Sequence, residues 1–374
     1  NCNSDNVLKT IDYFMRMHFD NPVVIYLECY DKSRITYLSE YIAANNKNEN
    51  LSVRLFRSCL TYEQKYRKPM NLVNHIRRFM CSVWMTDTSS MIFDDKVRKQ
   101  KLINMNYSTP LKMTPKIFDF SYIDYSYETS LLCAEVHSSL FRIRLENSYS
   151  IGFPRNDTII KSNKADRVRS WLMDKTGIDY KYLLVYAPTY RDYTGAFDSS
   201  FLGFEIDDDN MRDFLEKNNI VMVTKYHPLQ LNNRFFNSKR VVSYENGYSF
   251  SLYDLLAESD ALITDYSSVM HDYILSDKPV ILNCFDEEMY DATRGFAFEP
   301  LKEILPGIQV RNEREFTSAV TTYVINRDEQ YNYQTVKSLF HKFTDDKSSK
   351  RAAEHIMSII KEEKSEISPL IPER

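Results

Sequence analysis

The stretch DALITDYSSVMHDYILSDKPVILNC (260–284) carries the pattern that decides the fold. It opens with a short apolar run that ends in Thr264, and a cluster of Asp, Tyr and Ser side chains follows. A segment of helical composition comes next, and KPVILNC (278–284) is a second short apolar run. Strand, capping cluster, helix and strand in this order are typical of a βαβ unit in a parallel sheet. The stretch therefore predicts an α/β protein.

Further apolar runs repeat this pattern along the chain. Helical stretches lie around 207–218 and 250–258, the region 122–145 is helix-like, and the tail from 333 to 363 has helical spacing. Short strands that alternate with helices favour parallel α/β domains over an all-β or all-α fold. The remaining strand candidates are PVVIYLECY (22–30), LSVRLF (51–56), SSMIFDD (89–95), LINMNY (102–107), YLLVYAP (182–188) and NIVMVTKYHP (219–228).

Length and glycine content narrow the class of protein. A chain of 374 residues favours two domains. It has seven glycines, of which Gly152 is the first, and it contains neither GxGxxG nor GxxxxGK[ST]. The sequence therefore lacks the dinucleotide fingerprint and the P-loop, so a bound phosphate must be held in another way. Gly152 opens GFPRND (152–157), where a glycine and a proline indicate an interdomain boundary.

The charge, the cysteine and histidine positions and the lengths of the apolar runs argue against three features: nucleic-acid binding, a metal site and a membrane-spanning helix. The net charge of −4 gives no general argument for nucleic-acid binding. The six cysteines form no CxxC pair and the histidines show no zinc-ligand spacing, so we expect no metal site. No apolar run reaches the roughly 18 residues of a membrane-spanning helix.

Polar side chains follow three strand candidates in the second half. Because the carboxyl ends of parallel strands meet at one edge of a sheet, we expect these side chains to lie close together. Each cluster alone is weak, since a Ser/Thr/Asp cluster before a helix more often serves only as an N-cap. The side chains are Thr189, Arg191 and Asp192 after the first strand, His227 after the second, and Thr264, Asp265, Ser267 and Ser268 after the third.

This set of groups is suited to a diphosphate. The start of the helix near 267–270 would offer backbone N–H groups and the Ser267 and Ser268 hydroxyls. Arg191 would clamp phosphate oxygens with its forked guanidinium. His227 would stabilise charge on a leaving group. The sequence therefore predicts a nucleotide-diphosphate site.

Several motifs resemble the CDP-glycerol glycerophosphotransferase family, which contains the teichoic-acid primases and polymerases. The resemblance spans roughly residues 100–300, in order and in spacing, and its most specific part is SDALITDYSSVMHDY (259–273). The other matching motifs are STPLK (108–112), GFPRND (152–157), YAPTYRD (186–192), KYHP (225–228), KPVIL (278–282) and RGF (294–296).

The resemblance implies a GT-B architecture, in which two Rossmann-like domains face each other across a cleft. We expect an acceptor-side domain at 1–153, a CDP-donor-binding domain at 154–335 and a C-terminal helix with a frayed tail at 336–374. An acceptor hydroxyl would attack the β-phosphorus of the donor, and CMP would leave as a phosphodiester forms. The resemblance implies His227 as the histidine that stabilises the diphosphate. It implies donor-side roles for Thr189, Arg191, Asp192, Thr264, Asp265, Ser267, Ser268 and Arg294.

One motif departs from the family pattern. The family reads Trp-His-Gly-Thr-Pro-Leu-Lys, and its histidine is the expected general base, whereas this chain has Tyr107 at that position and Ser108 in place of the glycine. A phenol with an ordinary pKa near ~10 is a poor base at neutral pH. Three alternatives stay open: Tyr107 is tuned, another residue takes the proton, or the acceptor chemistry differs. The expected catalytic pair is His227 and Tyr107, and the expected acceptor-side residues are Glu28, Asp31, Thr109 and Lys112.

The resemblance favours transfer of glycerol phosphate or ribitol phosphate in the synthesis of teichoic-acid-like, capsular or surface polymers. The alternatives are a GT-B glycosyltransferase that uses a nucleotide sugar and a catalytically silent relative that binds nucleotide or polymer. We expect CDP-glycerol or CDP-ribitol as the donor, a glycan or lipid-linked polymer as the acceptor, no nucleic acid and no required cofactor. The expected location is cytoplasmic. Peripheral contact with the inner face of the membrane stays open, because the basic stretches at 97–101 and 161–169 would attract anionic lipid.

Overall fold

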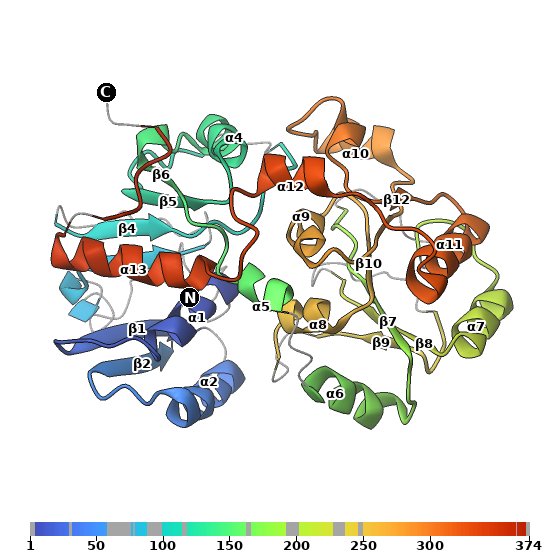
Figure 1. Cartoon of the computed structure of the whole chain (residues 1–374), viewed down its shortest axis with the longest axis horizontal. Helices are drawn as coiled ribbons and strands as arrows, with labels where there is room; N and C mark the ends of the chain where they lie inside the picture. The colour runs from blue at the N-terminus through green and yellow to red at the C-terminus, as the bar shows by residue number, and fades with distance from the viewer. Residues whose placement is uncertain are drawn as a thin grey trace. The chain divides into compact units, whose positions relative to one another are not determined.

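The structure is a computed structural model, and every structural statement below concerns the residues that it describes. These residues are 4–29, 32–57, 76–77, 79–87, 99–113, 118–161, 166–191, 202–226, 236–245, 250–363 and 365–371. Within these ranges the chain alternates strands and helices from end to end (Figure 1).

The chain forms two compact units, each built from separate pieces of sequence. The first consists of Asn1–Tyr107, Ile117–Asp157 and His341–Arg374, and the second of Ser108–Lys116 and Thr158–Phe340. This division differs from the expected boundaries in two ways. The C-terminal segment packs within the first unit instead of forming a separate tail, and a short piece of the N-terminal half packs within the second.

The first unit contains two parallel sheets. β1 pairs with β2, and the four short strands pair in the order β3-β4-β5-β6. Its elements are α1 (Asp5–Phe14), β1 (Val23–Cys29), α2 (Lys32–Asn45), β2 (Leu51–Arg57), β3 (Val83–Thr86), β4 (Lys101–Asn104), β5 (Tyr125–Glu128), α4 (Leu131–Phe141), η1 (Leu145–Asn147), β6 (Ser148–Ser150) and α13 (Ser348–Lys361), while α5 (Asn156–Lys161) runs from this unit into the other.

The core of the first unit joins its N-terminal and C-terminal helices. Ile11 of α1 and Ile356 of α13 are buried in one apolar cluster with Ile103 of β4. The neighbouring residue Leu102 is buried in a second cluster with Trp84. Because successive side chains of a strand point to opposite faces, β4 contributes to both clusters. In Figure 1, α13 runs alongside the strands of this unit.

The second unit contains one six-stranded parallel sheet in the order β12-β11-β10-β7-β8-β9. Counted along the chain, this is the order 6-5-4-1-2-3 of a doubly wound Rossmann-like sheet. Its elements are α6 (Asp166–Thr176), β7 (Tyr182–Tyr186), α7 (Asp208–Lys217), β8 (Ile220–Thr224), β9 (Val241–Ser243), α8 (Leu252–Glu258), β10 (Ala261–Thr264), α9 (Val269–Tyr273), η2 (Ile274–Ser276), β11 (Val280–Leu282), α10 (Glu287–Thr293), η3 (Leu301–Glu303), β12 (Ile308–Gln309), α11 (Glu313–Ala319), the π-helix η4 (Val320–Asn326) and α12 (Gln334–Phe340).

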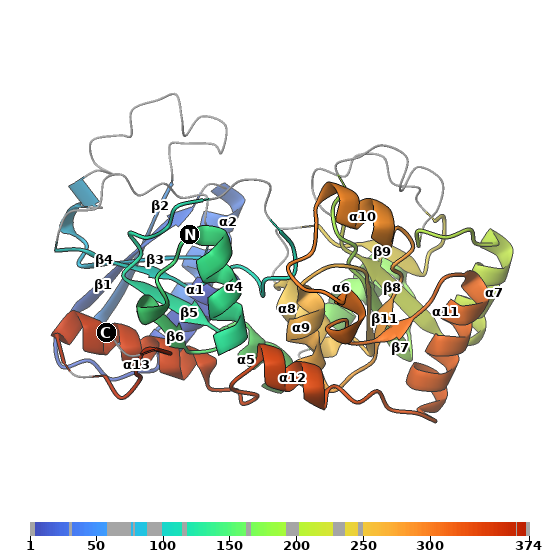
Figure 2. The ribbon, with the colours of Figure 1, turned by 90° about the horizontal axis from the view of Figure 1, so that it is seen from above.

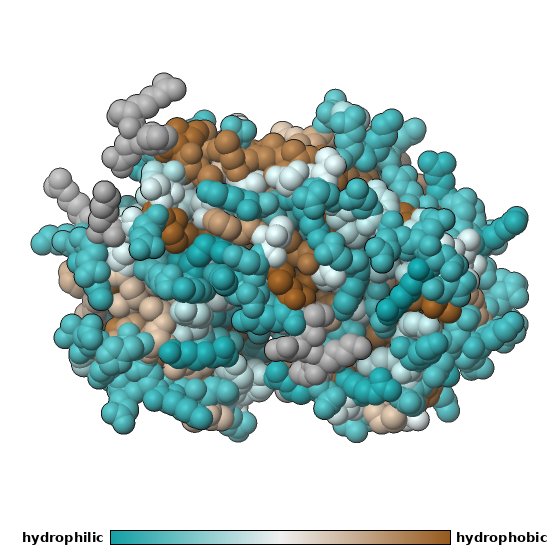
Figure 3. Space-filling model, viewed as in Figure 1, coloured by the Kyte–Doolittle hydropathy of each residue, from teal (hydrophilic) through white to brown (hydrophobic). Residues whose placement is uncertain are grey.

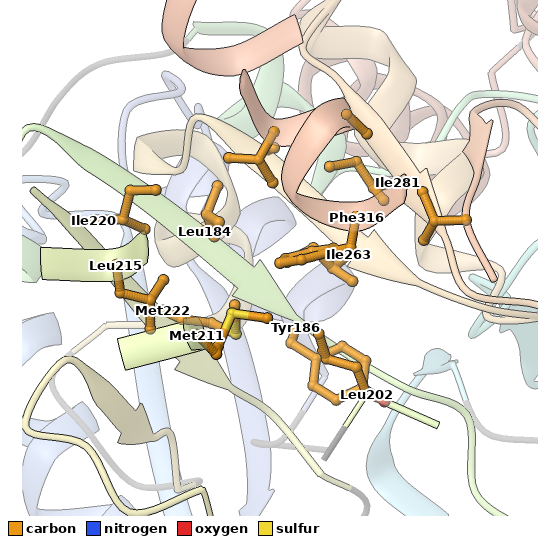
Figure 4. Close-up of a cluster of buried hydrophobic side chains, with 14 of the residues drawn as sticks. Leu184, Tyr186, Leu202, Met211, Leu215, Ile220, Met222, Ile263, Ile281 and Phe316 are labelled. Atoms are coloured by element: carbon orange, nitrogen blue, oxygen red, sulfur yellow. The ribbon is translucent and has the colours of Figure 1, made fainter. Parts of the chain in front are cut away.

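Helices cover both faces of the six-stranded sheet (Figures 1 and 2). Every residue of β7, β8 and β10 is buried, as expected of parallel strands between two helical layers. On one face Leu215 of α7 and Phe316 of α11 pack against side chains of the sheet, among them Leu184 and Ile263 (Figure 4). The central strands are therefore held on both faces, and their carboxyl ends form a fixed edge.

The strand candidates at 22–30, 51–56, 182–188, 219–228, 260–268 and 278–284 each coincide with all or most of a strand of the structure, so these predictions are confirmed. The prediction that 122–145 is helical is wrong in its first part, since β5 precedes α4 there. β5 reads YSYE, so its polar composition hides a strand that pairs with β4 and β6. The candidate at 89–95 lies outside the described residues.

Hydrophilic side chains cover most of the face shown in Figure 3, which agrees with the 27% share of charged residues. Among the described residues, no helix is both long enough and apolar enough to cross a membrane.

Candidate functional site

The carboxyl ends of β7 and β10 lie at the point where the strand order of the second sheet reverses. β7 is the first strand of this unit, β8 pairs on one side of it and β10 on the other. In doubly wound sheets this reversal opens a crevice where ligands bind. The residues that follow the two strands, Ala187–Arg191 and Asp265–Ser268 in chain order, therefore define the candidate site.

Short hydrogen bonds tie the two strand ends together. The Thr189 backbone N–H donates to Asp265 Oδ1 at 2.9 Å, and Thr264 Oγ1 donates to the Ala187 carbonyl at 2.7 Å. Both Thr264 and Asp265 are fully buried. Thr264 therefore stabilises the edge of the sheet. The Thr189 hydroxyl is buried and has no hydrogen-bond partner among the described residues.

Arg191 is buried and fully engaged within the protein. Its side chain is 1% exposed, its Nη1 lies 2.7 Å from Asp265 Oδ2, and its Nε and Nη2 donate to the two carboxylate oxygens of Asp286 at 2.9 Å. Nη1 also donates to the Thr189 carbonyl at 2.7 Å. This bidentate, desolvated arrangement fixes the loop after β7. In the structure Arg191 thus holds the loop after β7, and its expected contact with phosphate stays a prediction.

Lys112 and Thr109 belong to the second unit, although they were expected in the acceptor-side domain. The segment Ser108–Lys116 is part of the compact unit that contains β7 and β10. Lys112 pairs with Phe296 in an isolated antiparallel bridge, and its Nζ lies 5.9 Å from the centre of the Tyr290 ring. The segment therefore brings a cation to the candidate site from far along the chain.

Lys112 has both positively and negatively charged neighbours. Burial, together with the positive charges of Arg191 and Arg294, lowers the pKa of its ammonium group to about 8, although the Asp265 carboxylate opposes the shift. Desolvation disfavours the charged form of a lysine, and an incoming anion would restore it. Lys112 is therefore suited to bind a phosphate close to neutral pH.

Ser267, Ser268 and Arg294 complete the rim of the site. Ser267 and Ser268 are half-buried, and the Ser268 side chain makes no capping hydrogen bond to α9. α9 has five residues and continues into a 3-10 turn, so its dipole is much weaker than the sequence suggested. Arg294 follows α10 directly, as its C-cap, and is half-buried. Hydroxyls and side-chain cations, more than a helix dipole, supply the polar groups here.

In the first unit, Tyr107 follows β4 and is 69% exposed. A phenol with its ordinary pKa near ~10 stays protonated at neutral pH and is therefore a poor general base there. The Tyr107 backbone carbonyl accepts a hydrogen bond from Arg155, which fixes the chain at this point.

A buried polar network beside Tyr107 escaped the sequence analysis. Asn106 has a left-handed backbone with φ of 52°, and its Nδ2 donates to Glu128 Oε1 at 2.8 Å. Glu128 Oε2 lies 2.9 Å from His137 Nδ1, and both residues are buried. The network sets the turn that presents Tyr107. In the sequence, Glu128 lies within the region 122–145 that was predicted to be helical, so the local pattern does not indicate this network.

The other expected residues lie in the first unit or outside the described residues. Glu28 lines a cavity of about 460 Å³ between β1 and β3, whose other lining residues are mostly apolar. Asp31, Asp192 and His227 lie outside the described residues. Among the described residues there is no cluster of three or more His, Cys, Asp or Glu side chains that could hold a metal ion.

Comparison with solved structures defines the class of the fold. The chain aligns with the wall teichoic acid polymerase TagF with a TM-score of 0.66 and 22% identity, over 97% of this chain and 94% of that one. It aligns with a putative UDP-N-acetylglucosamine 2-epimerase from Listeria monocytogenes with a TM-score of 0.51 and 11% identity, over 94% of this chain and 100% of that one. The chain is an α/β protein of the GT-B class, built from two Rossmann-like units.

The family follows from the sequence. The family model described as CDP-Glycerol:Poly(glycerophosphate) glycerophosphotransferase matches residues 13–358, and the chain belongs to this family.

Two curated relatives show how far the similarity reaches. The teichoic acid ribitol-phosphate polymerase TarK of Staphylococcus aureus (strain NCTC 8325 / PS 47) is 30% identical over 190 residues, which are 49% of this chain and 36% of that protein. The teichoic acid glycerol-phosphate primase of Bacillus subtilis (strain 168) is 26% identical over 312 residues, 82% of this chain and 75% of that protein. The aligned region thus spans only 36% of the length of TarK.

A further structure of TagF was obtained after a soak with CDPG.

Proposed function

We propose that this protein transfers a polyol phosphate from a CDP-activated donor to a hydroxyl group, in the synthesis of a teichoic-acid-like polymer. The observation that carries the proposal is the polar rim where the strand order reverses, with Lys112, Arg294 and the Ser267 and Ser268 hydroxyls beside the ends of β7 and β10. Family membership over residues 13–358 supports it. The names of the relatives support glycerol phosphate or ribitol phosphate as the transferred group.

The reaction would be a displacement at the donor's β-phosphorus. A bond forms between the acceptor oxygen and this phosphorus, while the bond from phosphorus to the bridging oxygen breaks. The electron pair of that bond stays on the bridging oxygen, which leaves as part of CMP, and the acceptor proton passes to a base. Positive groups near the bridging oxygen lower the barrier because negative charge grows there.

The side chains divide into three roles under this proposal. Lys112 and Arg294 face the phosphates, and Ser267 and Ser268 donate hydroxyl hydrogen bonds to them. Arg191 holds the loop after β7 through Asp265 and Asp286. His227 keeps its expected role at the diphosphate. Tyr107, an exposed phenol that is protonated at neutral pH, orients the acceptor by a hydrogen bond, and another group takes the proton.

The proposal requires no metal ion and no cofactor. The acceptor is a glycan or polymer hydroxyl, and we include peripheral contact with the inner face of the cell membrane because lipid-linked acceptors reside there. The alternative in which the chain uses a nucleotide sugar is separated from this proposal by the choice of nucleotide.

A ligand screen by thermal unfolding tests the proposal. A ligand at a hundred times its Kd stabilises the folded state by ~2.7 kcal/mol, which is a measurable shift in Tm. We expect CDP-glycerol or CDP-ribitol to stabilise the protein more than CMP, UDP-sugars or GDP-sugars do. An equal or larger shift with a UDP- or GDP-sugar would contradict the proposal and favour glycosyl transfer.

A further inference from the structure

The segment Ser108–Lys116 is bound to the second unit by backbone pairing. The Ala297 N–H donates to the Leu111 carbonyl at 3.0 Å, and the Met113 N–H donates to the Gly295 carbonyl at 3.1 Å. Leu111 is buried, and Lys112 is the residue between these two bonds in the sequence. The pairing fixes the backbone on both sides of Lys112, whose position is set by the loop that follows Arg294.

His271 holds the other end of this segment. Its Nδ1 lies 2.9 Å from Thr109 Oγ1, and its Nε2 lies 3.2 Å from the Ile304 carbonyl oxygen. The ring stacks on Phe340 at 3.8 Å between centroids and 13° between planes. Thr109 and His271 are both buried. A buried imidazole with a partner on each nitrogen and a ring on its face has little freedom to move.

The partners also fix the tautomer of His271. A carbonyl oxygen can only accept, so Nε2 must carry the hydrogen that binds Ile304. In the neutral ring Nδ1 is then the acceptor, and the Thr109 hydroxyl donates to it. A valine at position 109 would fill the same space without this bond.

Lys112 adds a positive charge that no carboxylate neutralises directly. Asp265 and Asp286 both form ion pairs with Arg191. Among the described residues no carboxylate lies within ion-pair distance of Lys112, and its surroundings are Asp265, Arg191, Arg294 and the Tyr290 ring. An anionic ligand would therefore complete the charge balance of the site.

We propose that the Lys112 ammonium contacts the diphosphate of the CDP donor, and that His271 is the positioning residue that holds it there through Thr109. The inference rests on the proposed function and adds two roles to it. As the bridging P–O bond breaks and its electron pair moves to CMP, the ammonium group of Lys112 stabilises the growing charge. His271 touches neither substrate and acts only through the Thr109 hydroxyl.

Donor binding as a function of pH tests both roles. With CDP-glycerol as the probe in calorimetric titrations from pH 7.0 to 9.5, the affinity of the parent should fall as the pH rises through about 8, where Lys112 loses its proton. Lys112→Met should bind about ten- to a hundredfold more weakly at pH 7 and show no such inflection, because a charge-assisted hydrogen bond is lost. Lys112→Arg should keep the affinity but not the inflection.

The positioning role makes its own prediction in the same assay. Thr109→Val and His271→Phe should each weaken binding about tenfold and move the inflection upward, toward the ~10.4 of a solvated lysine, because Lys112 is then less buried. Thr109→Ser keeps the hydroxyl and should restore both values. The matched control is His355→Phe. His355 is also buried, and its Nδ1 lies 2.9 Å from the Tyr127 hydroxyl oxygen, but it belongs to the first unit.

The outcomes separate the inference from the proposed function. If the parent protein binds UDP-sugars and not CDP-glycerol, the proposed function is wrong. If the parent binds CDP-glycerol and Lys112→Met binds it equally well, the contact is wrong. If Thr109→Val and His271→Phe lower Tm as His355→Phe does but leave the donor affinity and the inflection unchanged, His271 has only a structural role and the positioning inference is overturned.

Discussion

Arg191 illustrates two different roles of an arginine: it can bind a phosphate, or it can form ion pairs within the protein. An arginine after a strand end predicted a phosphate clamp, but its Nε and Nη2 donate to Asp286, which lies 95 residues further along the chain. The sequence motif that contains Arg191 therefore does not reveal that Asp286 is its partner. A free guanidinium binds phosphate, whereas one held between two buried carboxylates shapes the loop that carries it.

Replacement of Arg191 by methionine should therefore destabilise the protein strongly. Methionine has similar length but leaves Asp265 and Asp286 buried without their cation, which costs about 3–5 kcal/mol. The measurement is the free energy of unfolding from denaturant titration. The double variant Arg191→Met with Asp286→Asn should recover part of the loss, because one of the unpaired carboxylates is then neutral.

The opposite result would return Arg191 to its expected role. A variant Arg191→Met as stable as the parent, with weaker CDP-glycerol binding, would mean that the guanidinium contacts the donor directly. No recovery in the double variant would mean that Asp286 is not the partner that matters.

At the scale of elements, the sequence predicted best those strands that are buried on both faces. β7, β8, β10 and β11 are short apolar runs, and every residue in them is buried, so composition alone reveals them. β5 was assigned to a helix because the region 122–145 is rich in aromatic residues and leucine, yet it lies between two strands and its Glu128 joins a buried network. Such a strand is stabilised by partners distant in sequence, which a local pattern does not contain.

The loop at Arg294 and the segment around Lys112 act together as one small element. Gly295 has φ of +73°, a conformation in which an L side chain costs about 1–2 kcal/mol. A Cβ atom there would also lie 3.3 Å from the Cβ and Cγ atoms of Met113. The glycine is therefore required both by the backbone and by the segment that passes over it.

Gly295→Ala should lower the stability by about 1–2 kcal/mol and also weaken CDP-glycerol binding, since the segment that carries Lys112 must shift. Gly177→Ala is the matched control, because Gly177 has φ of +65° but no atom within 4 Å of the added Cβ. We expect both variants to lose a similar free energy of unfolding and only Gly295→Ala to lose affinity. Equal affinity in the two variants would show that the pairing does not position Lys112.

At the scale of the whole molecule, the chain enters each compact unit more than once. Two α/β domains could be predicted from the sequence, but the return of α13 to the first unit could not. The sequence of an amphipathic helix at the end of a chain does not show which surface the helix packs against. GFPRND (152–157) supplies the anchor. Asp157 accepts hydrogen bonds from the backbone N–H groups of Ser348 and Ser349 at 2.9 and 2.8 Å, at the start of α13. The expected boundary motif is thus also the docking point of the last helix.

The two units should therefore respond separately to the loss of a helix cap. Asp157→Ala removes the acceptor at α13, and Asp207→Ala removes the matching acceptor at α7, where the carboxylate binds the N–H groups of Asp209 and Asn210. Each substitution should cost about 1–2 kcal/mol, because capping acceptors contribute this much. Hydrogen exchange followed by mass spectrometry should show faster exchange in β4 and β5 for Asp157→Ala and in β8 for Asp207→Ala, since each unit has its own apolar core. If either substitution lowered protection equally in both units, the chain would unfold as one cooperative body, and the discontinuous units would not be independent units of stability.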